Sequence, residues 1–257
     1  MRVLAIANQK GGVGKTTTTV NLGAALAQRG HRTVVVDLDP QGNLTAALGL
    51  RLDEGLSVYD TLVDGEPLGA VVRTTSTSDL LACPSDPSLA GADLELAADE
   101  PDPKRRASRL RECLATYGVE RPGVAFVLLD CPPSLGLLTV NALVAADAVL
   151  VPMQCEYFSM QGLARLLDTV ERVAGSWNPD LELAGVLFNM VDRRTNLTRQ
   201  VIEEVRREFG ARVFQSEIPR SVRLAEAPSH GIPLQSHDPR SPAAGIYSEL
   251  VSEVMAR

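Results

Sequence analysis

The stretch Lys10-Gly11-Gly12-Val13-Gly14-Lys15-Thr16-Thr17 decides the fold of this 257-residue chain. Residues 3–7 precede it as an apolar run that predicts a buried strand, and residues 18–28 follow it and predict a helix. A glycine loop between a strand and a helix is the setting of a phosphate-binding loop, because backbone N–H groups and the helix N-terminus face the anion. We expect Lys15 to neutralise the β- and γ-phosphates and the Thr16 hydroxyl to coordinate Mg²⁺. The sequence therefore predicts a nucleotide site on residues 10–17.

Lysine is rare in this chain and occurs at only three positions, 10, 15 and 104. Gln9 stands where the ordinary G-x-x-x-x-G-K-[ST] pattern has its first glycine, and Lys10 comes next. Because Lys15 already occupies the space beside the phosphates, we expect Lys10 to reach a phosphate held by a second copy of the chain, as an arginine finger does in trans. The alternative is a solvated surface lysine, which the scarcity of lysine and the position at the mouth of the loop disfavour.

Motifs spread in order over essentially the whole chain accompany this loop: residues 8–17, 37–43, 130–136, 154–157 and 218–231. Together they resemble the ParA/Soj partitioning ATPases, a group with a deviant phosphate-binding loop within a wider class that includes MinD and the nitrogenase iron protein. The resemblance implies an ATPase that uses ATP and Mg²⁺, forms an ATP-sandwich homodimer and binds double-stranded DNA without sequence preference. It also implies that ATP hydrolysis releases the DNA and that a ParB/Spo0J-type centromere-binding partner stimulates this hydrolysis. The protein would then be cytoplasmic and nucleoid-associated, and would segregate a chromosome or plasmid.

Apolar runs alternate with helical stretches along the chain, which predicts a single α/β domain over residues 1–257 with a mostly parallel sheet covered by helices on both faces. The expected strands are residues 3–7, 33–37, 124–130, 148–151 and 183–189. The expected helices, besides residues 18–28, are residues 137–146, 160–174, 196–209 and 243–255. Residues 50–122 give the weakest signal, with a turn at 100–103 before a charged helix. A strand that starts almost at Met1 leaves no room for an N-terminal helix-turn-helix.

Three aspartates lie at the ends of predicted strands, at the edge where open α/β sheets bind ligands. Asp37 and Asp39 end the second strand, and Asp130 ends the apolar run 126–129. A carboxylate there can orient the attacking water or hold a Mg²⁺-bound water. The resemblance assigns Asp39 to hydrolysis, Asp37 to the metal shell and Asp130 to Mg²⁺ through water. The alternatives are a plain turn over residues 39–42 and a helix cap at Asp130.

Two further residues are candidates for the adenine base. Asn189 follows a predicted strand and could hydrogen-bond the adenine edge, while Pro219 could pack on the adenine face. The alternative for Asn189 is a turn former. The family often has asparagine where this chain has Ser221, so the sequence departs from the family pattern beside Pro219.

The net charge of −7 argues against nucleic acid as a partner, but the charge is unevenly distributed. Residues 193–240 hold nine arginines against six acids, and a basic region on an acidic body can still face DNA. By resemblance, Arg194 and Arg223 match positions that the Soj family uses on DNA, and contact to phosphates is the expected mode. We expect the other arginines of this region, such as Arg206, Arg207 and Arg212, to solvate helix faces.

Two other functions would need features that this sequence does not show. A MinD-like membrane-cycling regulator needs a basic amphipathic C-terminal helix, whereas residues 247–257 carry two acids and one arginine. No apolar run approaches the ~20 residues of a membrane span, and no signal peptide is recognised. A redox enzyme of the same class needs a cluster-binding cysteine pair. The four cysteines lack C-x-x-C spacing and are expected in the core: Cys83, Cys113, Cys131 and Cys155.

Overall fold

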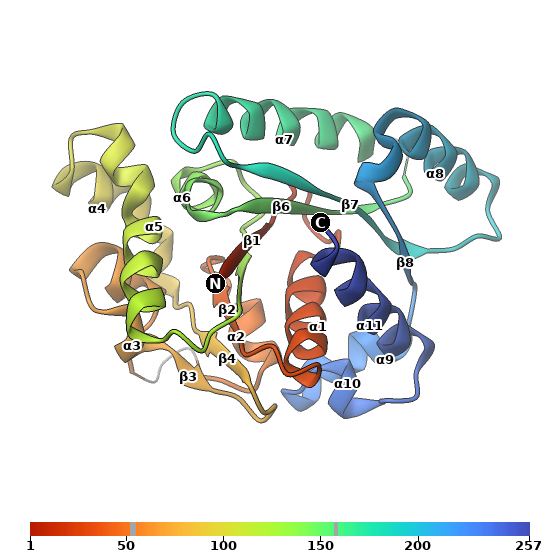
Figure 1. The fold of residues 1–257 in the computed structure, drawn as a ribbon, viewed down its shortest axis with the longest axis horizontal. Coiled ribbons are helices and arrows are strands. Elements are labelled where there is room, and N and C mark those ends of the chain that lie inside the picture. The colour runs from red at the N-terminus through yellow and green to blue at the C-terminus, as the bar shows by residue number, and fades with distance from the viewer. Residues whose placement is uncertain (52–54, 157–158) are drawn as a thin grey trace.

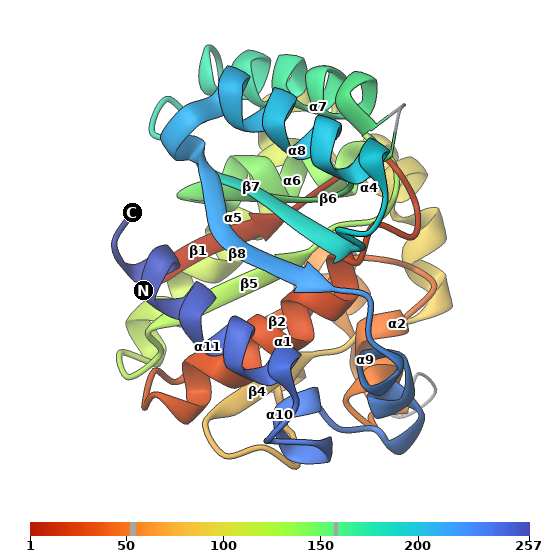
Figure 2. The ribbon, with the colours of Figure 1, turned by 90° about the vertical axis from the view of Figure 1, so that its right-hand side faces the viewer.

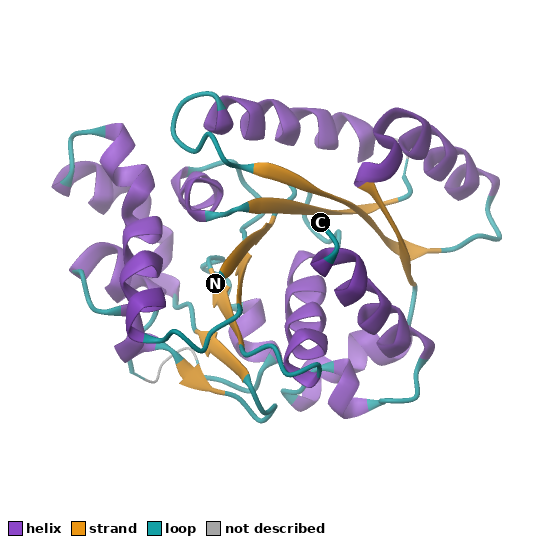
Figure 3. Cartoon of the chain, viewed as in Figure 1, coloured by secondary structure: helices purple, strands orange, loops and turns teal. Residues whose placement is uncertain are grey.

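In the computed structural model, which describes residues 1–51, 55–156 and 159–257, an eight-stranded sheet lies between two layers of helices (Figure 1, Figure 3). The strands are β1 (Arg2–Ile6), β2 (Thr33–Asp37), β3 (Arg73–Thr74), β4 (Leu80–Cys83), β5 (Phe126–Asp130), β6 (Ala148–Gln154), β7 (Glu182–Val191) and β8 (Val213–Pro219). The helices are α1 (Lys15–Gln28), α2 (Asn43–Ala47), α3 (Leu68–Val71), α4 (Ala92–Asp99), α5 (Pro103–Glu120), α6 (Leu137–Ala145), α7 (Ser159–Ala174), α8 (Asn196–Phe209), α9 (Val222–Glu226), α10 (Leu234–His237) and α11 (Pro242–Met255).

The strand order, β3-β4-β2-β5-β1-β6-β7-β8, places β1 and β5 at the centre of the sheet. Every neighbouring pair is parallel except β3 with β4, which is antiparallel. Ile6 pairs with Asp130, and Asp130 pairs in turn with Asp37, so three strands end at the same level. The loops that follow β1, β2 and β5 therefore emerge side by side at one edge of the sheet.

Side chains of β1 alternate between the two faces, as the period of a strand requires. Val3 and Ala5 pack into a core beneath α5, α6, α7 and α8, whereas Leu4 and Ile6 pack into a second core beneath α1, α2 and α11. Figure 2 shows α1 and α11 lying side by side on this second face, with β8 running along the outer edge of the sheet toward α9. The central strands are buried on both faces, which explains their nearly continuous apolar sequences.

The structure confirms the predicted α/β architecture and adds elements that the sequence pattern did not predict. Helix α1 begins at Lys15 rather than at residue 18, so Lys15 and Thr16 belong to its first turn. The region 50–122 contains α3, β3, β4 and α4, besides α5, which is the charged helix expected after the turn at residues 100–103. Strand β8 was not predicted either: Gln215 and Glu217 interrupt its apolar residues, as an edge strand tolerates.

The cysteines are free, and Cys83, Cys131 and Cys155 are buried, as the core interpretation predicts, while Cys113 is partly exposed. Within the described residues, no helix is long and apolar enough to cross a membrane.

Candidate nucleotide site

The predicted phosphate loop connects the end of β1 to the start of α1 at the carboxyl edge of the sheet. Gly12 and Gly14 adopt positive φ angles of 75° and 89°, which L side chains rarely adopt. A Cβ atom on Gly14 would also lie 2.6 Å from Nδ2 of Asn189, so another residue there would displace the amide that donates to Val13 and Thr18. The loop is held at its start by Asn8, which donates to the Pro152 carbonyl over 2.7 Å. The glycines are therefore required by the geometry of the loop.

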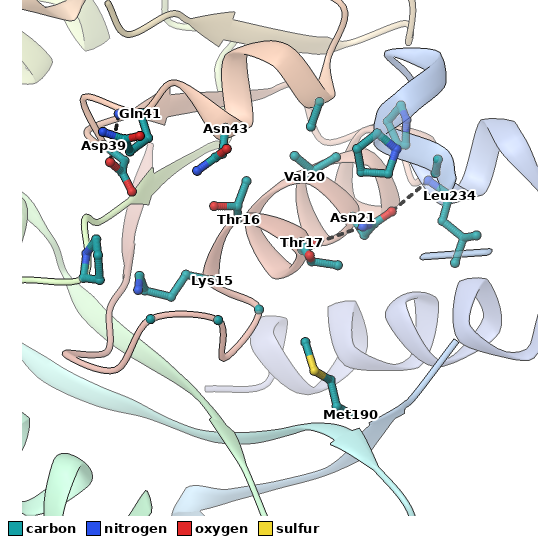
Figure 4. A pocket seen from close by; sticks show the side chains of 18 of the residues that line it. Lys15, Thr16, Thr17, Val20, Asn21, Asp39, Gln41, Asn43, Met190 and Leu234 are labelled. Carbon is teal, nitrogen blue, oxygen red and sulfur yellow. Dashed lines mark hydrogen bonds between the residues drawn. The ribbon is translucent and has the colours of Figure 1, made fainter. Parts of the chain in front are cut away.

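Lys15 lies with its side chain buried in the loop, and Nζ is 3.4 Å from the carbonyl oxygen of Lys10. Burial lowers the pKa of this ammonium, while the negative charge of Asp130 opposes the shift. Figure 4 shows Lys15 and Thr16 at the end of the loop, with Asp39 and Gln41 on the side away from Met190. A buried cation with no carboxylate in direct contact among the described residues is suited to an incoming anion.

Asp130 is brought to the loop by β5 and is almost completely buried. Thr16 Oγ1 donates to one carboxylate oxygen over 2.7 Å, and Thr19 Oγ1 donates to the other over 3.2 Å. Desolvation, and then the nearby charge of Asp37, raise the pKa of Asp130 to about 8. The structure thus joins Thr16 and Asp130, two of the three residues that the sequence analysis assigns to Mg²⁺ and its shell. The carboxylate sits where a cation would relieve the cost of its burial.

Asp37 ends β2 with both carboxylate oxygens occupied by the following segment. Oδ2 accepts from the backbone N–H of Thr45 over 2.8 Å and from its hydroxyl over 2.7 Å, while Oδ1 accepts from the N–H of Asp39 over 3.2 Å. Burial raises its pKa to about 6. In this arrangement Asp37 anchors α2 and the loop before it, and its predicted place in the metal shell stays a prediction.

Asp39 lies in the turn before α2 and faces the cavity beside Gln41 (Figure 4). Its Oδ1 accepts from the N–H of Gln41 over 3.0 Å, so residues 39–42 form the turn that the sequence indicated. The helix that follows is held at its far end by Gly49, whose backbone packs against Gly231: a Cβ on Gly231 would lie 2.7 Å from the Gly49 Cα. Helix α2 is therefore held at both ends, and it fixes the C-terminal side of the Asp39 loop.

Two adjoining cavities open beside the loop. One, of about 490 Å³, is lined by residues of the loop and of the segments around it, including Gly11, Gly12, Gly14, Lys15, Thr16, Thr17, Asp39 and Pro133. The other, of about 380 Å³, is lined by residues of β7, β8 and α9, including Asn189, Pro219, Ser221, Val222 and Leu224. Gly14, Thr17 and Met190 line both, so the two cavities meet at the first turn of α1.

Asn189 lies where the loop and the second cavity meet. Its Nδ2 donates to the carbonyl of Val13 over 2.9 Å and to Thr18 Oγ1 over 3.0 Å. Its Oδ1 is buried and has no hydrogen-bond partner among the described residues. Met190, which follows it, adopts a positive φ of 54°, a conformation that is strained in a non-glycine residue. The end of β7 therefore carries one buried acceptor without a partner, on a residue that lines the second cavity.

Lys10 and Val13 differ from the rest of the loop, because neither lines these two cavities. Lys10 Nζ forms an ion pair with Glu156, and both side chains are partly exposed, at 37% and 55%. Gln154, two residues earlier, donates to the Gly12 carbonyl over 2.8 Å. The motif at residues 154–157 therefore supports the loop from β6, although Tyr157 lies outside the described residues.

The predicted DNA contacts lie outside both cavities, on the C-terminal part of the chain. Arg194 is 89% exposed and pairs with Asp192, and Arg223 is 60% exposed and pairs with Glu226. They come from the loop before α8 and from α9.

Sequence reasoning did not identify Thr19 and Thr45, which hold Asp130 and Asp37 respectively. Thr19 could have been found, because it lies one helical turn after Lys15 and therefore shares a face with the loop. Thr45 gives no such signal, because its contact depends on where α2 packs.

Comparisons with known proteins agree with this geometry. A family model described as an AAA domain matches residues 1–183. The sporulation initiation inhibitor protein Soj of Bacillus subtilis is 48% identical over 99% of this chain and 98% of its own length. The chromosome partitioning protein ParA of Caulobacter vibrioides is 47% identical over 100% of this chain and 95% of its own.

Among solved structures, a Mycobacterium smegmatis protein named cobyrinic acid a,c-diamide synthase, with bound ADP and magnesium, superposes with a TM-score of 0.83. It is 37% identical, and the match covers 98% of this chain and 93% of that one. Full-length identity close to one half places the present chain with the partitioning proteins. The chain belongs to the Soj/ParA family of chromosome-partitioning ATPases.

Proposed function

We propose that this ATPase partitions DNA through a cycle in which ATP drives formation of a homodimer, the dimer binds DNA of any sequence, and hydrolysis releases it. One observation carries the proposal: Lys15, Thr16 and Asp39 line one cavity with Asp130 directly behind Thr16, whereas Lys10 is directed away from that cavity. This arrangement supports phosphate binding within one chain and leaves one lysine for a phosphate held by another.

In the proposed site, the loop N–H groups and Lys15 hold the phosphates of ATP. Thr16 and Asp130 would hold Mg²⁺, and their oxygen atoms are the ligands that this ion prefers. The ion would polarise the γ-phosphate and neutralise charge that develops during transfer. Asp39 would orient the attacking water. Its carboxylate lines the cavity, and its backbone N–H donates to Asp37, which anchors the loop.

The second cavity is proposed to take the adenine base. Asn189 lines this cavity, and its buried Oδ1, which has no partner among the described residues, would accept a hydrogen bond from the exocyclic amino group of adenine. Pro219 contributes an apolar wall, and Gly14 and Thr17 connect this cavity to the phosphate loop. Guanine carries a carbonyl in place of that amino group, so the same oxygen would repel it.

Lys10 and the two arginines are proposed to act between molecules. Lys10 would leave Glu156 to reach the γ-phosphate held by the second protomer, because exposed ion pairs are worth only about 0–1 kcal/mol. Arg194 and Arg223 would contact DNA phosphates, and dimerisation would double their number. A ParB/Spo0J-type protein is the proposed stimulating partner, and the nucleoid in the cytoplasm the proposed location.

The structure gives no support to a membrane-cycling role for the C-terminal helix. The apolar residues of α11, including Tyr247, Leu250, Val251 and Val254, are buried against α1 and β8, so they are not available to a lipid surface. A redox role is not favoured, because Cys131 is buried directly behind the phosphate loop rather than presented at a surface.

The test compares the parent protein with Lys15→Ala and, as a matched control, Lys104→Ala, which removes the same charge at the exposed start of α5. We expect the parent and the control to bind random-sequence duplex DNA only with ATP, measured by fluorescence anisotropy. Lys15→Ala should lose ATP binding in calorimetry and DNA binding with it. A parent protein that ignores DNA in the presence of ATP would contradict the proposal.

A further inference from the structure

A third arginine, Arg220, lies on the same surface as Arg194 and Arg223 but in a different setting. It follows Pro219, the last residue of β8, and precedes Ser221, whose hydroxyl caps α9 by accepting from the Leu224 N–H over 3.4 Å. Its side chain is exposed. Because the backbone is fixed by a strand on one side and by a helix cap on the other, the position of Arg220 is set by the fold.

The three arginines differ in their ion pairs. Arg194 forms a two-pronged pair with Asp192, with contacts of 2.5 and 2.8 Å. Arg223 lies 3.0 Å from Glu226 and 3.8 Å from Asp238. Arg220, by contrast, has no carboxylate within ion-pairing distance in the part of the chain that the structure describes. It is still close to the others: Asp192, whose pKa is held near 2 mainly by Arg194, also feels the charge of Arg220.

We propose that Arg220 is a phosphate contact for DNA, and that it contributes more to binding than either Arg194 or Arg223. The inference rests on the DNA binding proposed above. A paired arginine must give up its carboxylate before it can bind a phosphate, and an exposed pair of this kind can weaken the new contact by up to about fivefold. Arg220 has no such competitor to release, so its full charge is available to a backbone phosphate.

The segment that carries Arg220 also forms a wall of the second cavity, which is proposed to take the adenine base and is called the base cavity below. Pro219, Ser221, Val222, Leu224 and Ala225 line that cavity. Arg220 lines it as well. Its guanidinium could therefore contact either a DNA phosphate or the base of a bound nucleotide. Because Arg220 is exposed and has no carboxylate partner among the described residues, we assign its guanidinium to DNA, and the experiment below tests the nucleotide as the other possible neighbour.

The experiment compares Arg220→Gln, Arg194→Gln and Arg223→Gln with the parent, using random-sequence duplex DNA, ATP and a series of salt concentrations. Arg172→Gln, at an exposed position in the last turn of α7, removes the same charge elsewhere and is the control. We expect Arg220→Gln to weaken DNA binding most. Its salt slope should fall by about 0.9 for each phosphate that is no longer neutralised, or roughly 2 for a dimer. Arg172→Gln should follow the parent curve.

Calorimetry with ATP on the same variants separates the two possible neighbours of Arg220. A larger loss of DNA affinity than of ATP affinity in Arg220→Gln supports the inference. An equal loss of both would assign the guanidinium to the nucleotide and overturn it. A curve for Arg220→Gln that superposes on Arg172→Gln, with a parent that binds DNA, overturns this inference alone. A parent that does not bind DNA overturns the proposed function itself.

A second variant pair tests the premise that carboxylates compete with DNA. Asp192→Asn removes the partner of Arg194, whereas Asp180→Asn makes the same charge change at an exposed position outside this cluster. We expect Asp192→Asn to strengthen DNA binding by up to about fivefold relative to Asp180→Asn. Equal effects of the two substitutions would show that internal pairing does not limit Arg194, and the proposed ranking would fall.

Discussion

Asp39 is the residue whose loss should separate ATP binding from ATP hydrolysis. It lines the cavity but forms no hydrogen bond or ion pair with Lys15 or Thr16, so we expect Asp39→Ala to leave the phosphate loop intact. If Asp39 orients the attacking water, its removal raises the barrier without removing ground-state contacts. We therefore expect calorimetric ATP affinity within about threefold of the parent and kcat reduced by at least about a hundredfold.

The same variant should accumulate as an ATP-bound dimer, because hydrolysis is the step that ends the proposed cycle. Size exclusion with light scattering in ATP measures this directly. Asp168→Ala, which removes a carboxylate at an exposed position of α7, serves as the control. A purely monomeric Asp39→Ala protein in saturating ATP would refute the role given to Asp39.

Lys10 is expected to act on a nucleotide other than its own. Its ammonium pairs with Glu156 outside the cavity, so Lys10→Ala should bind ATP as a monomer with nearly unchanged affinity. Dimerisation and stimulated turnover should be lost, since groups that act in trans on phosphoryl transfer contribute about 10³–10⁵ in rate. Glu156→Gln is the companion variant: it frees Lys10 and should leave the dimer intact. A normal ATP-dependent dimer in Lys10→Ala would return this residue to the surface-lysine interpretation.

At the level of residues, the sequence could predict which groups meet but less well what each one does. Lys15, Thr16 and Asp130 were expected together because loop spacing and strand ends are local signals, and the structure brings them together. The contacts of Asp37 with Thr45 were not predictable. They depend on where α2 packs, which no local pattern of residues 43–47 encodes.

At the level of elements, predictability followed burial. The central strands are buried on both faces, so their apolar runs were recognisable in the sequence. In the amphipathic helices α7 and α8, the apolar residues recur at helical spacing. Strand β8 lies at the sheet edge, where Gln215 is exposed and Glu217 pairs with Arg193 and Arg206, so polar residues break the apolar pattern. Before α5, region 50–122 consists of short elements, and a two-residue strand or a four-residue helix leaves too few positions for a period to appear.

The contact between Gly49 and Gly231 should be essential to the packing of α2. Gly231 has a φ of +66°, and a Cβ there would lie 2.7 Å from a backbone atom of Gly49. Gly65, with a φ of +78° and open space around its Cβ position, is a matched control for backbone strain alone. We expect Gly65→Ala to cost about 1–2 kcal/mol and Gly231→Ala to cost more, on the order of 3 kcal/mol.

Denaturant unfolding of the two glycine variants measures the difference in their free energies of unfolding. The comparison requires that both variants keep the parent's dependence of this free energy on denaturant concentration. Because α2 also holds the Asp39 loop through Thr45 and Asp37, a displaced α2 should slow hydrolysis in Gly231→Ala at temperatures where the variant is still folded. Equal stabilities for Gly231→Ala and Gly65→Ala would show that the backbone contact contributes nothing.

At the level of the whole molecule, the local charge of the predicted DNA surface differs in sign from the net charge of the chain. The net charge is −7, yet the arginines predicted for DNA gather at the loop before α8 and at α9, beyond the base cavity. Each protomer alone offers few phosphate contacts, and Arg194 and Arg223 are both paired with carboxylates. Binding by a monomer should therefore be weak, and a dimer, which doubles the surface, should gain affinity without any new contact chemistry.

This reasoning predicts how DNA binding depends on salt. With ATP, the parent should bind any duplex with a Kd near ~10⁻⁴–10⁻⁶ M at physiological salt, and binding should weaken steeply as salt rises. Arg194→Ala and Arg223→Ala should weaken binding to all sequences alike and lower the salt slope by about 1 for each phosphate that the variant leaves without its arginine. ATP hydrolysis without DNA should persist in both variants, because neither arginine lines the phosphate cavity. Anisotropy titrations across a salt series, on two unrelated duplexes, decide the matter: an unchanged slope in both variants would place the DNA surface elsewhere, and a weakening confined to one duplex would mean that base edges rather than phosphates are read.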